Sequence, residues 1–117
     1  MILHVVLYQP RATATLEERT ELVAALEAAC HEIPVIQQVR VGKAMDLGMG
    51  YMNWSLDQQM DYVAVFEFRD EIDLRSYLAH DHHRRLAEMF WKVCERTTII
   101  DVAAVDPLGG ESIAKIG

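Results

Sequence analysis

The chain has 117 residues, of which 51% are hydrophobic and 25% are charged. This length fits one domain with its own core, and the apolar fraction is too high for a disordered chain. The formal net charge of −7 repels a phosphate backbone, so we expect no nucleic-acid partner.

The cysteines and the first residues indicate where the protein works. Cys30 and Cys94 are the chain's two cysteines, too few and too far apart for a disulfide scaffold or a metal motif, which favours a reducing compartment. The apolar run at residues 2–8 is too short to span a membrane and lacks the basic stretch of an export signal. We therefore expect a cytoplasmic protein with no membrane association.

The first half of the chain predicts two strands separated by a helix. Residues 2–8 are rich in β-branched and aromatic side chains, which is typical of a strand. Thr15 and Glu18 match the capping box, and apolar residues at steps of three and four predict a helix that ends at Pro34. Residues 35–45 alternate weakly and predict the second strand.

A loop, two more strands and two helical segments are predicted in the second half. Residues 46–58 have no sustained period, and we interpret their Met and aromatic side chains either as a lid over a ligand or as a contact with a second subunit. Residues 60–68 predict a third strand, and residues 97–105 predict a fourth. Between them, Asp70 begins one helix and Asp81 is expected to cap another that runs to about Glu95.

The predicted order is βαββαβ, which is typical of a ferredoxin-like α+β fold. We expect an antiparallel four-stranded sheet with both helical layers on one face. Apolar residues lie on both sides of the predicted strands, so the other sheet face needs a cover. The expectation is a domain over residues 1–105 that forms a homodimer through the sheet face, followed by a tail at 106–117.

Several short motifs occur in an order that resembles a known family. They are His4 in an L-H-V-V-L strand, the Ile33-Pro34 helix end, Val41-Gly42, the Y-L-A-H-D-H-H segment at 77–83 and the closing T-T-I-I-D-V. Together they resemble the stress-responsive α/β-barrel (Dabb) family over residues 2–105. The resemblance implies a dimeric ferredoxin-like barrel with a cavity between sheet and helices in each subunit.

The same resemblance implies a set of site residues. By motif position, His4, Tyr77 and His83 correspond to the active-site residues of a characterised plant member, a polyketide cyclase. We predict these as catalytic residues, and Tyr62, His80 and Phe66 as substrate-binding residues. The chain departs from the family at Asp81, where proline is usual, and at Tyr62, where the cyclase has histidine.

The chemistry of this set also follows from the residue types. Tyr77, His80 and His83 recur at steps of three, so a continuous helix would place them on one face. If the helix instead breaks near His80, as the family's usual proline implies, His83 begins the next helical segment. A neutral imidazole can take a proton from an acidic carbon, and a phenol can hydrogen-bond the enolate that forms. The alternative is structural: the imidazoles cap helix ends and the phenol fills the core.

A metal site is a further alternative for the histidines. His80 and His83 have His-x-x-His spacing, with Asp81 or His4 as a third ligand. No His-Glu-x-x-His motif or cysteine pair supports it, so we predict no metal and no cofactor.

Three functions remain open from the sequence. The first is an enzyme or pocket protein for a carbonyl-containing, mostly apolar small molecule. The second is a non-catalytic, stress-related homo-oligomeric protein, and the third is a cofactor-free oxygenase of the dimeric α/β-barrel type.

Overall fold

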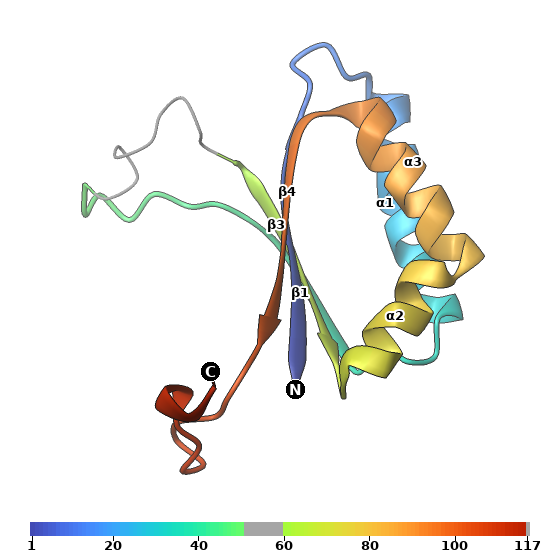
Figure 1. The fold of residues 1–117 in the computed structure, drawn as a ribbon. Coiled ribbons are helices and arrows are strands. Elements are labelled where there is room, and N and C mark those ends of the chain that lie inside the picture. The colour runs from blue at the N-terminus through green and yellow to red at the C-terminus, as the bar shows by residue number, and fades with distance from the viewer. Residues whose placement is uncertain (51–59, 117) are drawn as a thin grey trace.

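Strands and helices follow one another in the predicted βαββαβ order, with the second helix divided into two (Figure 1). The computed structural model describes residues 1–50 and 60–116. Its elements are β1 (Ile2–Pro10), α1 (Leu16–Glu32), β2 (Gln38–Lys43), β3 (Tyr62–Phe68), α2 (Glu71–Ala79), α3 (Asp81–Val93), β4 (Cys94–Ala103) and a short 3-10 helix, η3 (Ile113–Lys115).

The four strands form one antiparallel sheet in the order β2-β3-β1-β4. All three α-helices cover the same face of this sheet, as Figure 1 shows. The register places His4 on β1 opposite Phe66 on β3 and opposite Asp101 on β4. The ferredoxin-like fold expected from the sequence is confirmed, and its central strands are β1 and β3.

The core lies between the sheet and the helices. Successive side chains of a strand point to opposite faces, so one face of each strand supplies core residues. On β3, Ala64, Phe66 and Phe68 are fully buried, so this face of the strand points toward the helices. The helices add an apolar stripe from α1 and a second one from α3, whose buried members are Leu86, Met89, Phe90 and Val93.

The local signals in the sequence locate α1 well and β4 less well. Thr15 accepts from the Glu18 amide while the Glu18 carboxylate accepts from the Thr15 amide, so the predicted capping box is present. Strand β4 begins at Cys94, three residues before the predicted start, directly where α3 ends. The sequence pattern did not indicate this start, because Glu95 and Arg96 are polar. They lie at a solvent-facing end of the strand, where no apolar alternation is required.

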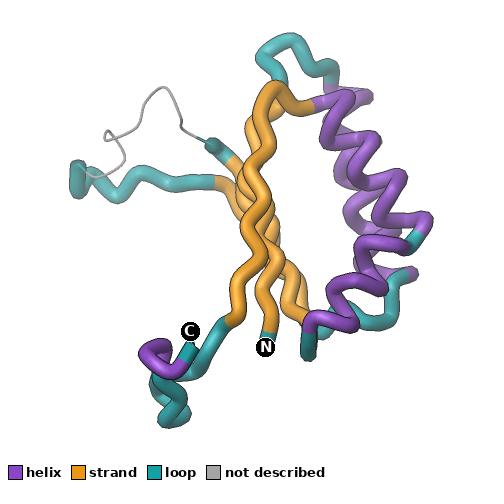
Figure 2. The backbone as a smooth tube through the Cα atoms, in the orientation of Figure 1, coloured by secondary structure: helices purple, strands orange, loops and turns teal. Residues whose placement is uncertain are grey.

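The sheet face that carries no helix, called the far face below, is apolar at its centre. Strand alternation and register place the following side chains there: Leu3, Val5, Leu7, Val63, Val65, Ile100 and Val102. Ile100 is 50% exposed and Val102 is 37% exposed. Residues 44–50 and the tail with η3 both leave the sheet on this side, as Figures 1 and 2 show. The far face is therefore an uncovered apolar surface between two projecting segments.

The sequence also predicted the location of the protein, its domain boundary and the role of residues 46–58. In the ranges 1–50 and 60–116, no helix is both long and apolar enough to cross a membrane; that the protein is cytoplasmic stays a prediction. The domain boundary after residue 105 also stays a prediction. In the segment interpreted as a lid or contact, Met49 is 72% exposed, whereas Tyr51, Met52 and Trp54 lie outside the described residues.

Candidate functional site

The break between α2 and α3 falls at His80. Its backbone is extended, with φ −75° and ψ 144°, so the chain cannot continue as one helix there. The His80 Nδ1 accepts a hydrogen bond of 3.1 Å from the His82 amide and thereby caps α3. The prediction of Asp81 as the cap was wrong. Asp81 is the first residue of the helix, and its carboxylate forms an ion pair of 2.7 Å with Arg84 instead.

We expect the substitution His80→Ala to lower the free energy of unfolding by about 1 kcal/mol, the usual loss for an N-cap acceptor. His80→Asn keeps a side-chain acceptor at the same place and is expected to retain most of that stability. Urea unfolding measures both changes, and His31→Ala, at an exposed position on α1, is the matched control. Equal stability of His80→Ala and wild type would show that the cap contributes nothing.

The break also brings Tyr77 and His83 together. Tyr77 lies near the end of α2 and His83 near the start of α3, and their ring centroids are 4.8 Å apart. The Tyr77 ring packs at 5.3 Å from Phe66 and 5.0 Å from Phe68 on β3. This packing fixes the phenol ring, so its hydroxyl has a defined direction.

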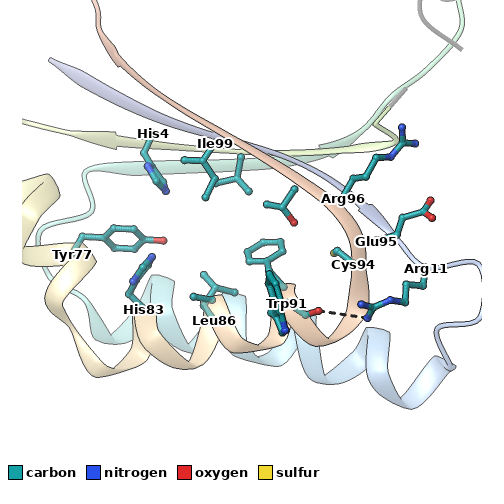
Figure 3. Close-up of a pocket in the computed structure, with 14 residues that line it drawn as sticks. His4, Arg11, Tyr77, His83, Leu86, Trp91, Cys94, Glu95, Arg96 and Ile99 are labelled. Carbon is teal, nitrogen blue, oxygen red and sulfur yellow. Dashed lines mark hydrogen bonds between the residues drawn. The ribbon is translucent and has the colours of Figure 1, made fainter. Parts of the chain in front are cut away.

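His4 joins this pair from the sheet. It lies on the inward face of β1 with 3% of its surface exposed, and its ring centroid is 5.6 Å from that of Tyr77. Figure 3 shows the Tyr77 hydroxyl directed into the space between the imidazoles of His4 and His83. The structure therefore brings together the three residues predicted as catalytic.

Asp101 holds the imidazole of His4. The His4 Nδ1 lies 2.5 Å from Asp101 Oδ1, across the β1–β4 pairing. A carboxylate only accepts hydrogen bonds, so Nδ1 carries the proton and donates it. In the neutral ring, Nε2 is then the acceptor. Sequence reasoning missed Asp101 as a site residue, although a lone acid within the apolar T-T-I-I-D-V strand was a visible signal.

The surroundings of these groups set their protonation. Burial lowers the pKa of His83 from its usual 6.5, and the neighbouring His4 lowers it further, while a hydrogen bond with the Leu78 backbone partly opposes both. Burial raises the pKa of the Tyr77 hydroxyl well above its usual range. At neutral pH, the imidazole of His83 is therefore neutral and the hydroxyl of Tyr77 stays protonated.

A cavity of about 410 Å³ opens beside these residues. His4, Tyr77 and His83 form one end of it, called the inner end below, and Leu86 and Ile99 lie next to them along the cavity (Figure 3). Other apolar side chains, Val6 and Phe90 among them, also line it. This size and this mixture of an apolar wall with a few polar groups are typical of small-molecule sites.

Cys94 also lines the cavity. Burial raises the pKa of its thiol to about 11, so the thiol stays protonated at neutral pH. A protonated thiol is a poor nucleophile, so this environment does not activate Cys94.

The residues predicted to bind substrate lie elsewhere. Among the described residues, the cavity lining does not include Tyr62, His80 or Phe66. Tyr62 stacks on Tyr8 at 5.4 Å, His80 caps α3, and Phe66 packs against Tyr77 with ring centroids 5.3 Å apart. Substrate contact by these residues stays a prediction, as do the catalytic roles of His4, Tyr77 and His83.

The described histidines do not form a metal site. Within residues 1–50 and 60–116, no group of three or more His, Cys, Asp or Glu side chains could hold a metal ion. His80 and His82 stack with ring centroids 5.5 Å apart, and His80 uses its Nδ1 as the helix cap.

Solved structures with the same fold come from plants and bacteria. A protein of Arabidopsis thaliana has a TM-score of 0.74 at 19% identity, over 91% of this chain and 97% of that one. A Dabb family protein of Mesorhizobium loti has a TM-score of 0.66 at 20% identity, over 90% and 97% of the two chains. A hydroxynitrile lyase of Passiflora edulis has a TM-score of 0.76 at 10% identity, over 90% and 94%.

Other neighbours of this fold are described as dimeric ferredoxin-like proteins, including one from Thermobifida fusca with 21% identity and a TM-score of 0.68, over 88% of this chain and 90% of that one. Comparison with proteins of curated function finds no match. The model of the stress responsive A/B barrel domain matches residues 2–104. With nearly its whole length matched by that model, the chain belongs to the stress responsive A/B barrel domain (Dabb) family.

Proposed function

We propose that this protein binds a carbonyl-containing, mostly apolar small molecule in the cavity and moves a proton on the carbon next to the carbonyl. The observation that carries the proposal is the meeting of His4, Tyr77 and His83 at one end of an apolar cavity of about 410 Å³. The resemblance in fold to a hydroxynitrile lyase indicates that this fold can house an enzyme, but the proposal rests on the side chains.

His83 is the proposed base. Its ring is neutral at neutral pH because burial lowers its pKa, and a neutral imidazole has a free lone pair for a proton. The proton moves from the substrate carbon to this nitrogen, and the C–H electron pair forms the enolate. The reverse transfer from the imidazolium returns a proton to carbon and restores the base.

Tyr77 is the proposed partner of the enolate oxygen. Its raised pKa keeps the hydroxyl protonated, so the group donates a hydrogen bond where negative charge develops. His4 is the proposed orienting residue. Its bond with Asp101 fixes which ring nitrogen carries the proton, and hence which nitrogen faces a ligand as acceptor.

The experiment is deuterium exchange into ethyl butyrylacetate, followed by NMR at the carbon between its two carbonyls. The protein is expected to accelerate exchange above the buffer rate. Because protonated His83 cannot accept a proton, the catalysed rate should fall as the pH drops through the His83 pKa, with a midpoint below 6.5, and be level above it. No acceleration at any pH, or a catalysed rate that rises toward acid, would contradict this mechanism.

We also propose that a second copy of the chain covers the far face. Its apolar centre is uncovered, and the segments that project on the same side can flank a partner sheet (Figure 1). Neighbours of the same fold are described as dimeric. Each subunit then keeps its own cavity, since helices and partner lie on opposite faces of the sheet.

A further inference from the structure

The outer end of the cavity differs in chemistry from the inner end. Opposite the two histidines and Tyr77, the lining residues are Arg11, Trp91, Glu95 and Arg96 (Figure 3). Strand alternation and register direct Arg96 toward the far face, so Arg11 is the cation at this end whose side chain contacts α3. A guanidinium at the end of an apolar cavity attracts an anionic group such as a carboxylate.

The two ends are separated by the length of an extended small molecule. On α3, Trp91 follows His83 by eight residues, which spans about 12 Å at the rise of an α-helix. On β4, Asp101 follows Thr97 by four residues, which spans about 13 Å. Leu86 and Ile99 lie between the two ends (Figure 3), and Val6 and Phe90 add to the apolar lining of the cavity.

Arg11 is positioned to hold an anion at the outer end. Its Nη1 donates to the backbone carbonyls of Trp91 and Lys92 at the end of α3, which anchors the guanidinium. In the part of the chain that the structure describes, both of these hydrogen bonds use Nη1. A guanidinium has five N–H donors, so Nε and Nη2 can still bind the two oxygens of a carboxylate.

From these observations we propose that the ligand is an elongated organic acid. Its carboxylate binds Arg11 at the outer end, its apolar chain lies along the middle of the cavity, and its reactive carbonyl reaches Tyr77 and His83. Trp91, with 85% of its surface exposed, covers the chain where it leaves the cavity. The position of the reactive carbonyl rests on the proposed function, whereas the carboxylate site can be tested by binding alone.

Octanoate and octanamide are the probes, because they match in shape and differ in charge. Isothermal titration of the wild-type protein at neutral pH is expected to give octanoate a dissociation constant at least about tenfold lower, since hydrogen bonds to charged groups are the stronger ones. In Arg11→Gln, the dissociation constant of octanamide divided by that of octanoate should fall to near one. Arg75→Gln removes the same charge from an exposed ion pair on α2 and should leave the ratio unchanged.

Equal affinity for both probes, failure of both to bind, or a ratio that survives Arg11→Gln would overturn the carboxylate site. Because Arg11 also binds the end of α3, the comparison of probes on the wild-type protein stands without any variant. Ethyl butyrylacetate carries no charge, so its exchange does not depend on Arg11. If the wild-type protein catalyses exchange but does not prefer octanoate, the acid site alone is refuted. If it prefers octanoate but does not catalyse exchange, the proton-transfer function alone is refuted.

Discussion

Replacing His83 with alanine is expected to slow catalysed exchange of ethyl butyrylacetate by about 10²–10⁴-fold, the usual contribution of a positioned general base. His83 is the residue expected to take the proton, because burial keeps its ring neutral and its ring lies 4.8 Å from that of Tyr77. Exchange followed by NMR on the wild type and the variant, at the same protein concentration, gives the ratio directly.

The matched control for this variant is His31→Ala. His31 lies on the last turn of α1 at an exposed position, outside the cavity lining. It should exchange at the wild-type rate, as should any variant that only removes an imidazole from the surface. If His83→Ala and His31→Ala exchange equally fast, His83 is not the base, and the cavity would retain at most a binding role.

The second large effect concerns assembly. Val5→Lys puts a charge at the centre of the far face, where Val5 lies opposite Val65 and Ile100 on its neighbouring strands. Burying an unpaired charge in an interface costs several kcal/mol, so the dimer dissociation constant should rise by at least about a hundredfold. Size-exclusion chromatography with light scattering is expected to find a dimer for the wild type and a monomer for Val5→Lys.

Val23→Lys is the control for that experiment. Val23 is 51% exposed on α1, on the opposite side of the molecule from the far face, so the variant should stay a dimer. Circular dichroism should find both variants folded, because neither position belongs to the buried core. A wild-type monomer at micromolar concentration, or a dimer that Val5→Lys leaves intact, would contradict assembly through the far face.

Local sequence signals were enough to predict the order of the strands and helices. The capping box at Thr15 marks the start of α1 because its hydrogen bonds form within one turn and need no distant partner. The inward face of β3 follows from alternation alone, since Ala64, Phe66 and Phe68 are separated by single residues. The family motifs added the prediction that Tyr77 and His83 belong to one site, which the local pattern alone left open.

Contacts between distant segments were harder to predict. His4 and Asp101 are 97 residues apart, and they meet only because of the register between β1 and β4. The cap of α3 was misplaced because His80 and Asp81 are adjacent residues that can both accept from a helix amide. Which one does so depends on where α2 ends, and the backbone breaks at His80.

The outer end of the cavity had no signal in a single sequence. Arg11 follows β1, whereas Trp91 and Arg96 come from α3 and β4, and no motif links them. They become neighbours because the start of α1 and the end of α3 lie at the same end of the molecule, where Lys92 pairs with Glu21 at 3.6 Å. Such a site follows from the contact between the β1–α1 connection and the end of α3, and not from spacing along the chain.

A crystal structure with acetylacetone, whose enol resembles the proposed intermediate, is the most direct measurement. An enol oxygen is expected within hydrogen-bond distance of the Tyr77 hydroxyl, with the central carbon facing the imidazole of His83. Side chains filling that space, or a ligand that binds only outside it, would refute the claim that these rings enclose a reaction chamber.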